Sequence, residues 1–300
     1  ALVARHRESL DAVSADLAQR FELDPRCRID AGSGDNMYGA VGTGNVEPGI
    51  VTVSLGTSGT AYTCMEQAYI DASGEIAAFC DSTGRFLPLL CVSNLANGYN
   101  AIVQQYGLSH AEFNELIQQT PPGNNGRLLI PWYVGERTPD VPIAGPIYFG
   151  FGVHEFGKEN LCRAVLEGHI LNLYDGFRKM PIQPTEIRLT GGLAQSPAWC
   201  QTIADIFEAE AVPVEGEGAA LGAAVHAAWV YYKEAGQPVS LKELVRPYVV
   251  MREERRCKPI PANREIHRLQ KQVFQALSER VRGKSSAADP FALREKMIKQ

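Results

Sequence analysis

Apolar and polar positions alternate along residues 51–55, a pattern typical of a half-buried β-strand. Val51, Val53 and Leu55 fall on one face of this predicted strand. The alternation breaks at Gly56-Thr-Ser-Gly59 and then resumes in a second apolar strand that ends at Cys64. The pattern therefore predicts a β-hairpin with a glycine-rich, hydroxyl-bearing tip.

This tip allows two interpretations. Its two glycines let the backbone adopt positive φ and approach a ligand closely. Its two hydroxyls and its free backbone N–H groups make a concavity that suits an anion. A polar hairpin turn explains the same four residues equally well, so the rest of the chain has to decide between the two.

The remaining periodicities predict a chain in which strands and helices are mixed. Residues 1–22 read as one amphipathic helix, and a long helix with a buried stripe is expected over 156–179. Further strands are expected at 27–31, 85–93, 128–131, 186–190 and 211–214, and further helices at 37–44, 99–106, 109–119, 197–208, 219–233, 241–245 and 262–282. Residues 135–152 are predicted to form an ordered loop, and residues 283–300 a polar, mobile tail. This order predicts an α/β fold with a mixed sheet.

A second glycine elbow follows the short strand at 27–31. Gly32-Ser-Gly34 leads into Asp35 and Asn36 at the start of a small-residue helix. An acid between the carboxyl end of a strand and the first turn of a helix lies where α/β folds place their chemistry. The helix dipole favours the ionised carboxylate there. The alternative is that Asp35 or Asn36 only caps the helix.

Composition narrows the functional classes. The chain has 300 residues, of which 45% are hydrophobic, and a net charge of −5. This charge favours neither nucleic acid nor an anionic membrane as a partner. No apolar run has the roughly 20 residues that span a bilayer. We see no signal-peptide pattern, and the start at Ala1 inside a helical pattern suggests a missing N-terminal part or a processed start.

The cysteines and histidines carry no metal-site pattern. None of the seven cysteines forms a C-x-x-C pair, and the six histidines are isolated from one another. Scattered cysteines in apolar segments are typical of reduced thiols in a cytoplasmic protein. The sequence therefore predicts a cytoplasmic protein with no metal ligands of its own.

Several stretches, in this order, resemble the FGGY family of carbohydrate kinases. The resemblance covers roughly residues 25–282 and rests on the following stretches: Gly32-Ser-Gly-Asp-Asn36 with Gly39-Ala-Val-Gly42, Ser54–Thr60, Pro131–Pro139, Asn160–Glu167, Thr190-Gly-Gly192, and Gly218–Ala224. It implies a ribonuclease H-like (actin-like ATPase) fold, with a mixed sheet flanked by helices. It also implies four parts: 1–49 as the end of a first, sugar-binding domain, 50–250 as a nucleotide-binding domain, 251–282 as a helical segment, and 283–300 as the tail.

The resemblance also implies roles for individual residues. Asp35 matches the catalytic base that takes a proton from the sugar hydroxyl, and Asn36 a residue that holds another hydroxyl. The nucleotide, ATP with Mg²⁺, would be bound by residues of three turns: Gly56, Thr57 and Ser58 at the β- and γ-phosphates, Gly98 in the phosphate channel, and Gly191, Gly192 and Ser196 along the adenosine. Alternatives remain open: Gly98 could only start a helix, and Ser196 is expected to cap one. Glu136 and Arg137 are expected to form a structural ion pair rather than to face substrate.

The expected substrate is a sugar. The Gly135-Glu-Arg-Thr-Pro139 stretch resembles family members that phosphorylate D-xylulose at its C5 hydroxyl, with gluconate kinases close behind. Ribulose, glycerol and a non-catalytic actin-like nucleotide-binding module are the other hypotheses, although such a module needs no acid at Asp35. The family's N-terminal Asp-x-Gly-Thr and Met-His-Gly segments are absent from this sequence. We therefore expect the chain alone to be inactive, and the complete protein to be a homodimer.

Overall fold

A computed structural model describes residues 9–216, 218–237, 239–284 and 288–299. Its centre is a mixed six-stranded sheet with the order β10-β9-β3-β4-β6-β5. β3, β9 and β10 run parallel, whereas β3, β4, β6 and β5 are joined antiparallel. The strands are β3 (Ile50–Leu55), β4 (Gly59–Thr63), β5 (Ile76–Cys80), β6 (Phe86–Val92), β9 (Glu186–Thr190) and β10 (Glu210–Pro213). The predicted hairpin and mixed sheet are thus confirmed.

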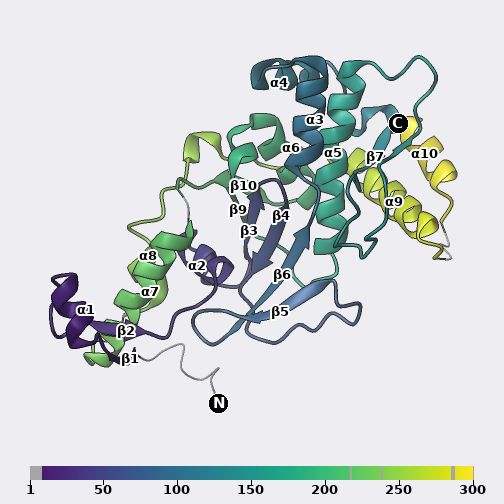
Figure 1. The fold of residues 1–300 in the computed structure, drawn as a ribbon. Helices are drawn as coiled ribbons and strands as arrows, with labels where there is room; N and C mark the ends of the chain where they lie inside the picture. Colours follow the sequence, from purple (N-terminus) through teal and green to yellow (C-terminus); the bar gives the residue numbers. More distant parts are fainter. Residues whose placement is uncertain (1–8, 217, 238, 285–287, 300) are drawn as a thin grey trace.

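Helices cover both faces of this sheet (Figure 1). One face carries α3 (Ala96–Tyr106), α4 (His110–Gln118), α5 (Lys158–Phe177), α6 (Pro197–Phe207) and α9 (Arg264–Val281). The other face carries α2 (Asp35–Gly42), α7 (Gly218–Glu234) and α8 (Leu241–Val245). Val51, Val53 and Leu55 are fully buried in the larger core cluster, as their alternation predicted. Thr52 lies on the opposite face of the sheet, where its hydroxyl is 2.8 Å from the hydroxyl of Thr43, the residue that ends α2.

Helices α2 and α7 touch through their backbones, which fixes where α2 lies on the sheet. A Cβ atom on Gly222 of α7 would lie 1.8 Å from the carbonyl oxygen of Tyr38, and one on Gly42 of α2 would lie 1.7 Å from that of Gly218. Only glycine allows such an approach. The close packing of the two helices fixes the position of α2 relative to the six-stranded sheet.

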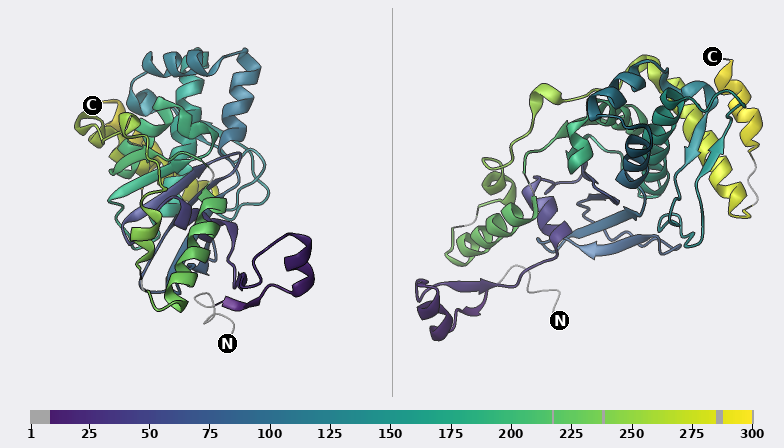
Figure 2. Two further views of the ribbon diagram at one scale, coloured as in Figure 1. Left: turned by 90° about the vertical axis from the view of Figure 1, so that its left-hand side faces the viewer. Right: turned by 45° about the horizontal axis from the view of Figure 1, so that its top comes forward.

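The predicted N-terminal helix is wrong. Residues 1–8 lie outside the described part, β1 (Ser9–Ala12) pairs antiparallel with β2 (Arg28–Asp30), and α1 spans only Ala15–Arg20. The side chain of Ser14 accepts a hydrogen bond from the Leu17 N–H and starts this short helix. Leu10 and Leu17, which would lie on the apolar face of such a helix, are 54% and 41% exposed, so no core stabilises the longer helix. Figure 2 shows this part projecting from the body of the molecule.

Two further segments differ from the prediction. The edge strand β5 was missed, because its short run gains its structure from pairing with β6. The polar tail contains the helix α10 (Pro290–Ile298), which Asp289 caps and which packs on α9 and the turn at residues 122–126. Arg294 anchors α10 by donating to the carbonyl oxygens of Gly126 and Gly150. In the supposed loop at 135–152, β8 (Ile147–Phe149) pairs with β7 (Leu128–Ile130).

Candidate functional site

The hairpin tip is fastened to the start of α3. The N–H groups of Leu95 and Ala96 donate to the carbonyl oxygens of Thr57 and Gly56, at 3.1 Å each. These bonds use the tip carbonyls and leave the tip side chains at the surface, where Gly56, Thr57 and Ser58 are not buried. The tip is therefore a fixed platform rather than a loose turn.

A pocket of about 510 Å³ opens beside this platform. Four segments meet there: the end of β3, α3, α4 and the turn after β9. The lining residues are Leu55, Gly56, Thr57, Ala96, Tyr99, Asn100, His110, Asn114, Gly192, Leu193, Gln195 and Ser196. The structure thus brings together Gly56, Thr57, Gly192 and Ser196, four of the seven residues predicted for the nucleotide, although they lie up to 140 positions apart in sequence.

The two neighbouring glycines after β9 have different surroundings. Gly191 has a φ of +89°, and a Cβ atom on it would lie 2.6 Å from the carbonyl oxygen of Leu55. A Cβ atom on Gly192, which lines the pocket, would meet nothing within 4 Å. Gly191 therefore lets this turn cross β3, whereas Gly192 keeps the pocket open for a ligand.

Ser196 joins two walls of the pocket. Its hydroxyl donates to Oδ1 of Asn114 on α4, at 2.7 Å. Ser196 stands at the N-cap position of α6, but its side chain makes no capping hydrogen bond there. The predicted N-cap position is therefore confirmed, but the hydroxyl makes no capping bond because it is bonded to a different helix.

An aromatic pair forms a wall that the sequence did not predict. Tyr99 of α3 and His110 of α4 are stacked, with ring centroids 5.7 Å apart and planes 7° apart. The Tyr99 hydroxyl and His110 Nδ1 are hydrogen-bonded, and burial raises the pKa of Tyr99. Tyr99 also packs edge-on against Trp199 of α6. These contacts connect residues from three helices that are separate in sequence. The one signal available in the sequence was the aromatic residue Tyr99 in the first turn of α3.

Gly98 faces the protein interior and does not line the pocket. A Cβ atom on it would lie 2.4 Å from Cε1 of His169 and 2.6 Å from Cε2 of Tyr133. His169 is completely buried, and burial lowers its pKa to about 4. Close packing therefore accounts for the glycine at this position, and its predicted role toward phosphate stays a prediction.

Asp35 stands at the first position of α2, with Gly34 at the N-cap. Its Oδ1 accepts from the backbone N–H of Asn36 at 2.7 Å and from Asn36 Nδ2 at 3.0 Å, and the side chain is exposed. Tyr62 of β4 lies under α2, and burial together with the nearby Asp35 charge raises its pKa. The hairpin that carries the tip thus also supports the helix that carries Asp35. Asp35 itself does not line the 510 Å³ pocket.

The expected ion pair between Glu136 and Arg137 is wrong, although Glu136 is structural. Glu136 is buried while Arg137 is exposed, and the contact that Arg137 makes with the Glu136 carboxylate is through its backbone N–H. The Glu136 carboxylate instead accepts hydrogen bonds from amide groups of Ser93, Asn94, Asn172 and Arg137, at 2.5 to 3.4 Å. Since Ser93 and Asn94 lie just before α3, separated from it only by the N-cap residue Leu95, this carboxylate stabilises the start of a helix that lines the pocket.

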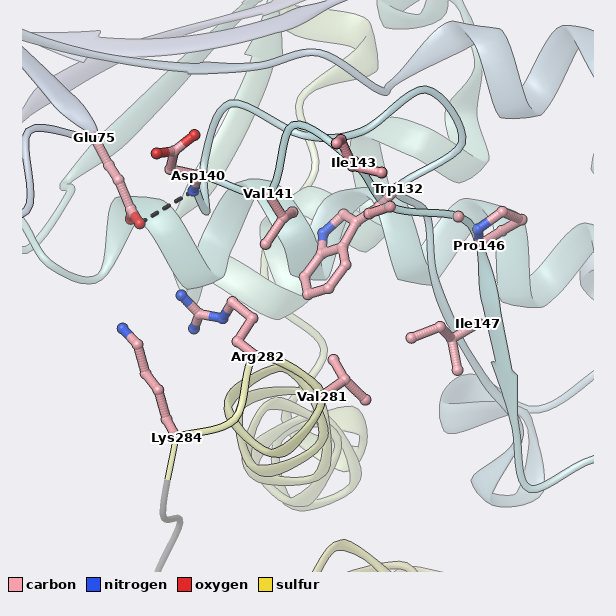
Figure 3. A pocket seen from close by; sticks show the side chains of 12 residues that line it. Glu75, Trp132, Asp140, Val141, Ile143, Pro146, Ile147, Val281, Arg282 and Lys284 are labelled. Atoms are coloured by element: carbon pink, nitrogen blue, oxygen red, sulfur yellow. Dashed lines mark hydrogen bonds between the residues drawn. The ribbon is translucent and has the colours of Figure 1, made fainter.

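Another pocket, of about 620 Å³, shares none of these lining residues. It lies between the 140–147 loop and the end of α9, and Figure 3 shows Trp132, Val141 and Ile147 facing Val281 and Arg282 across it. At its rim, Glu75 accepts a hydrogen bond from the backbone N–H of Asp140. It contains none of the predicted site residues.

Neither a metal centre nor a membrane span is found in the part of the chain that the structure describes. No group of three or more His, Cys, Asp or Glu side chains there could hold a metal ion. None of the helices described is both long and apolar enough to cross a bilayer. All seven cysteines are free thiols.

A mixed sheet with helices on both faces and a glycine-lined pocket at the strand ends defines the chain as an actin-like ATPase fold. Residues 51–231 match the family model described as "FGGY family of carbohydrate kinases, C-terminal domain". The chain therefore belongs to the FGGY family.

The similar proteins within this family are sugar kinases. The chain is 38% identical to a xylulose kinase of Haemophilus influenzae over 226 residues, which cover 74% of this chain and 46% of that protein. It is 29% identical to a gluconokinase of Bacillus subtilis, covering 71% of this chain and 45% of the other. The solved xylulose kinase from Bifidobacterium adolescentis matches with a TM-score of 0.70 and 30% identity, covering 83% of this chain and 50% of that one. The chain spans about half the length of the curated relatives it matches.

Proposed function

We propose that this chain is the nucleotide-binding half of an ATP-dependent sugar kinase that transfers the γ-phosphate of ATP to the C5 hydroxyl of D-xylulose. The observation that carries the proposal is the pocket formed by Gly56, Thr57, Gly192 and Ser196 in a chain of the FGGY family. Similarity to xylulose kinases supports the choice of sugar.

Each predicted residue has a role in this proposal. Asp35 accepts the proton of the attacking C5 hydroxyl, since a carboxylate within hydrogen-bond reach is what this step requires. Asn36 binds a neighbouring sugar hydroxyl. Backbone N–H groups and hydroxyls at the hairpin tip (Gly56, Thr57 and Ser58) donate to the β- and γ-phosphate oxygens and stabilise the charge of the transition state. Gly98 borders the phosphate channel, and Gly191, Gly192 and Ser196 lie along the adenosine.

The described residues do not form a Mg²⁺ site by themselves. Phosphate oxygens and one or two carboxylates commonly hold this ion. We therefore assign no residue of this chain to Mg²⁺, and expect it to enter with ATP. Because half of the relatives' length lies outside the chain, we expect the 300 residues alone to bind nucleotide without useful turnover.

A coupled ADP-release assay tests the proposal. The 300-residue chain and a protein extended by an N-terminal half would each be offered D-xylulose, D-gluconate, D-ribulose and glycerol with ATP and Mg²⁺. We expect turnover by the extended protein only, fastest with D-xylulose. Turnover with none of the four would contradict the kinase proposal and favour a non-catalytic nucleotide-binding module.

Gluconate is the second candidate substrate, because a gluconokinase is among the similar proteins. A higher kcat/KM for D-gluconate than for D-xylulose in the same panel would select it. A homodimer and a cytoplasmic location complete the proposal. The dimer rests on the resemblance to the family and is tested by light scattering, whereas the seven free thiols support a reducing compartment.

A further inference from the structure

His226 of α7 is a fully buried histidine with an acceptor at each ring nitrogen. Its Nδ1 lies 2.7 Å from Oδ2 of Asp30, and its Nε2 lies 2.8 Å from the carbonyl oxygen of Ser82. A carboxylate and a backbone carbonyl both accept hydrogen bonds, whereas a neutral imidazole has only one N–H to donate. Both bonds therefore form together only when each ring nitrogen carries a proton, that is, in the imidazolium.

This side chain connects segments that are distant in sequence. Asp30 ends β2, and Ser82 lies in the turn between β5 and β6. The ring of Tyr38 on α2 packs against the imidazole with 5.4 Å between centroids. His226 thus joins the end of β2 to the sheet that carries the nucleotide pocket.

The connection lies next to Asp35. Only four residues separate Asp30 from Asp35, and α7 holds the chain on both sides of them. On one side His226 binds Asp30, and on the other the glycine contacts with Tyr38 and Gly42 hold α2. The other contact between α7 and the β1–β2 pair lies nearer the solvent: Glu234 lies 3.7 Å from Arg28 and accepts a hydrogen bond from the backbone N–H of Ser9 at 2.7 Å.

We propose that His226, as an imidazolium bonded to Asp30 and Ser82, is a positioning residue that holds Asp35 in place for proton transfer. The proposal rests on the proposed function, in which Asp35 is the base. Without the two bonds, the end of β2 and residues 31–34 are released, and the first turn of α2, which begins at Asp35, is held only from its C-terminal side by the glycine contacts at Tyr38 and Gly42. Asp35 then loses its fixed distance to the sugar hydroxyl, and a misplacement of about 1 Å can cost up to roughly 100-fold in rate.

The test compares His226→Phe and His226→Gln with two controls in a protein extended by its N-terminal half. Glu234→Gln removes the charge from the exposed ion pair with Arg28 while keeping an acceptor for the Ser9 N–H, and His267→Phe removes another buried histidine, which bonds Gln270 through Nδ1. We expect His226→Phe to lower kcat by roughly 10- to 100-fold with the KM for ATP within twofold. His226→Gln should keep part of the rate, because an amide can still donate to one partner. Both controls should stay within threefold of the parent protein.

Two further measurements separate this proposal from the proposed function. Imidazole ¹⁵N NMR should show a proton on both nitrogens of His226, and hydrogen exchange at residues 31–36 should be faster in His226→Phe than in Glu234→Gln. Equal kcat losses in His226→Phe and His267→Phe, or unchanged exchange at 31–36, would overturn the positioning role. If the parent protein phosphorylates no sugar, the proposed function fails, and the exchange and NMR results alone decide whether His226 holds this segment.

Discussion

Gly191 crosses Leu55 so closely that a Cβ atom on the glycine would lie 2.6 Å from the leucine carbonyl oxygen. This contact joins the end of β9 to the end of β3, the two strands between which the candidate nucleotide pocket opens. The next residue, Gly192, has open space in place of a neighbour. The two glycines can therefore be tested separately, one for the fold and one for the ligand.

Gly191→Ala should lower the free energy of unfolding by about 3 kcal/mol, because it combines a backbone conformation reserved for glycine with a backbone clash. Urea denaturation measures this change. Gly74→Ala is the matched control, since Gly74 also has positive φ (+70°) but no atom within 4 Å of its Cβ position. It should cost about 1 kcal/mol. Equal losses in both variants would show that the crossing at Leu55 carries no strain.

Gly192→Leu should weaken ATP binding at least about tenfold, or about 1.4 kcal/mol, because the new side chain fills the pocket. Its φ is not positive and its Cβ position is free, so unfolding should change by less than about 0.5 kcal/mol. Calorimetric titration with ATP measures the affinity. Gly145→Leu adds the same side chain at another open position, outside this pocket, and should bind ATP normally. Unimpaired ATP binding by Gly192→Leu would place the nucleotide elsewhere.

Asp35→Asn should reduce kcat by roughly 10²- to 10⁴-fold in the extended protein, since the amide cannot accept the proton. Binding of ATP should persist, because Asp35 does not line the pocket. Single-turnover phosphoryl transfer and ATP titration separate the two effects. Asp16→Asn removes another exposed carboxylate from the first turn of a helix and should leave both unchanged. A normal rate in Asp35→Asn would favour the non-catalytic module.

Glu136→Gln should destabilise the protein by about 2 to 4 kcal/mol. The new NH₂ group would face N–H donors where the carboxylate now accepts, leaving buried polar groups unsatisfied. Thermal and urea unfolding report the loss. Glu47→Gln, at an exposed glutamate paired with Lys242, should cost less than about 1 kcal/mol. A similar small effect in both variants would mean that Glu136 does not support the start of α3.

Stability should fall in mild acid because His169 is buried in its neutral form. Its native pKa is about 4, below the ordinary value of 6.5, so between these values the unfolded chain binds a proton that the native protein does not. The stabilisation is complete above pH 6.5 and is lost as the pH falls toward 4, by up to roughly 3 kcal/mol. Urea unfolding from pH 4.5 to 7.5 measures this slope. His169→Phe should flatten it, and an unchanged slope in that variant would assign the effect to other groups.

Segments with strong local signals were predicted correctly. The alternation at 51–55 and the glycines at 56–59 define their elements through contacts that such patterns anticipate. The long helix expected over 156–179 is present as α5, but it is buried on nearly all sides rather than along one stripe. The helix expected at 109–119 is confirmed as α4, and Ser109 and Glu112 form a capping box at its start. Family resemblance from these segments is borne out by the family match over residues 51–231.

Segments whose structure depends on partners elsewhere in the chain were not predicted correctly. β1 exists because it pairs with β2, β5 because it pairs with β6, and α10 because Arg294 reaches Gly126 and Gly150. Three pocket residues were not predicted for the same reason: Tyr99, His110 and Asn114. They come together only when α3, α4 and the turn after β9 pack against one another.

The sequence by itself determined the hairpin, the two glycine turns, the acid at the start of α2 and the family. These features depend on local backbone freedom and side-chain periodicity, which residue order alone encodes. Only the tertiary structure decided that Gly192 lines a pocket, whereas Gly191 and Gly98 pack against other residues of the protein. The same holds for the hydrogen bond between His226 and Asp30. Those distinctions depend on which atoms lie within a few ångströms of each residue. Tertiary packing determines these neighbours, and some of them come from residues about 200 positions away in the sequence.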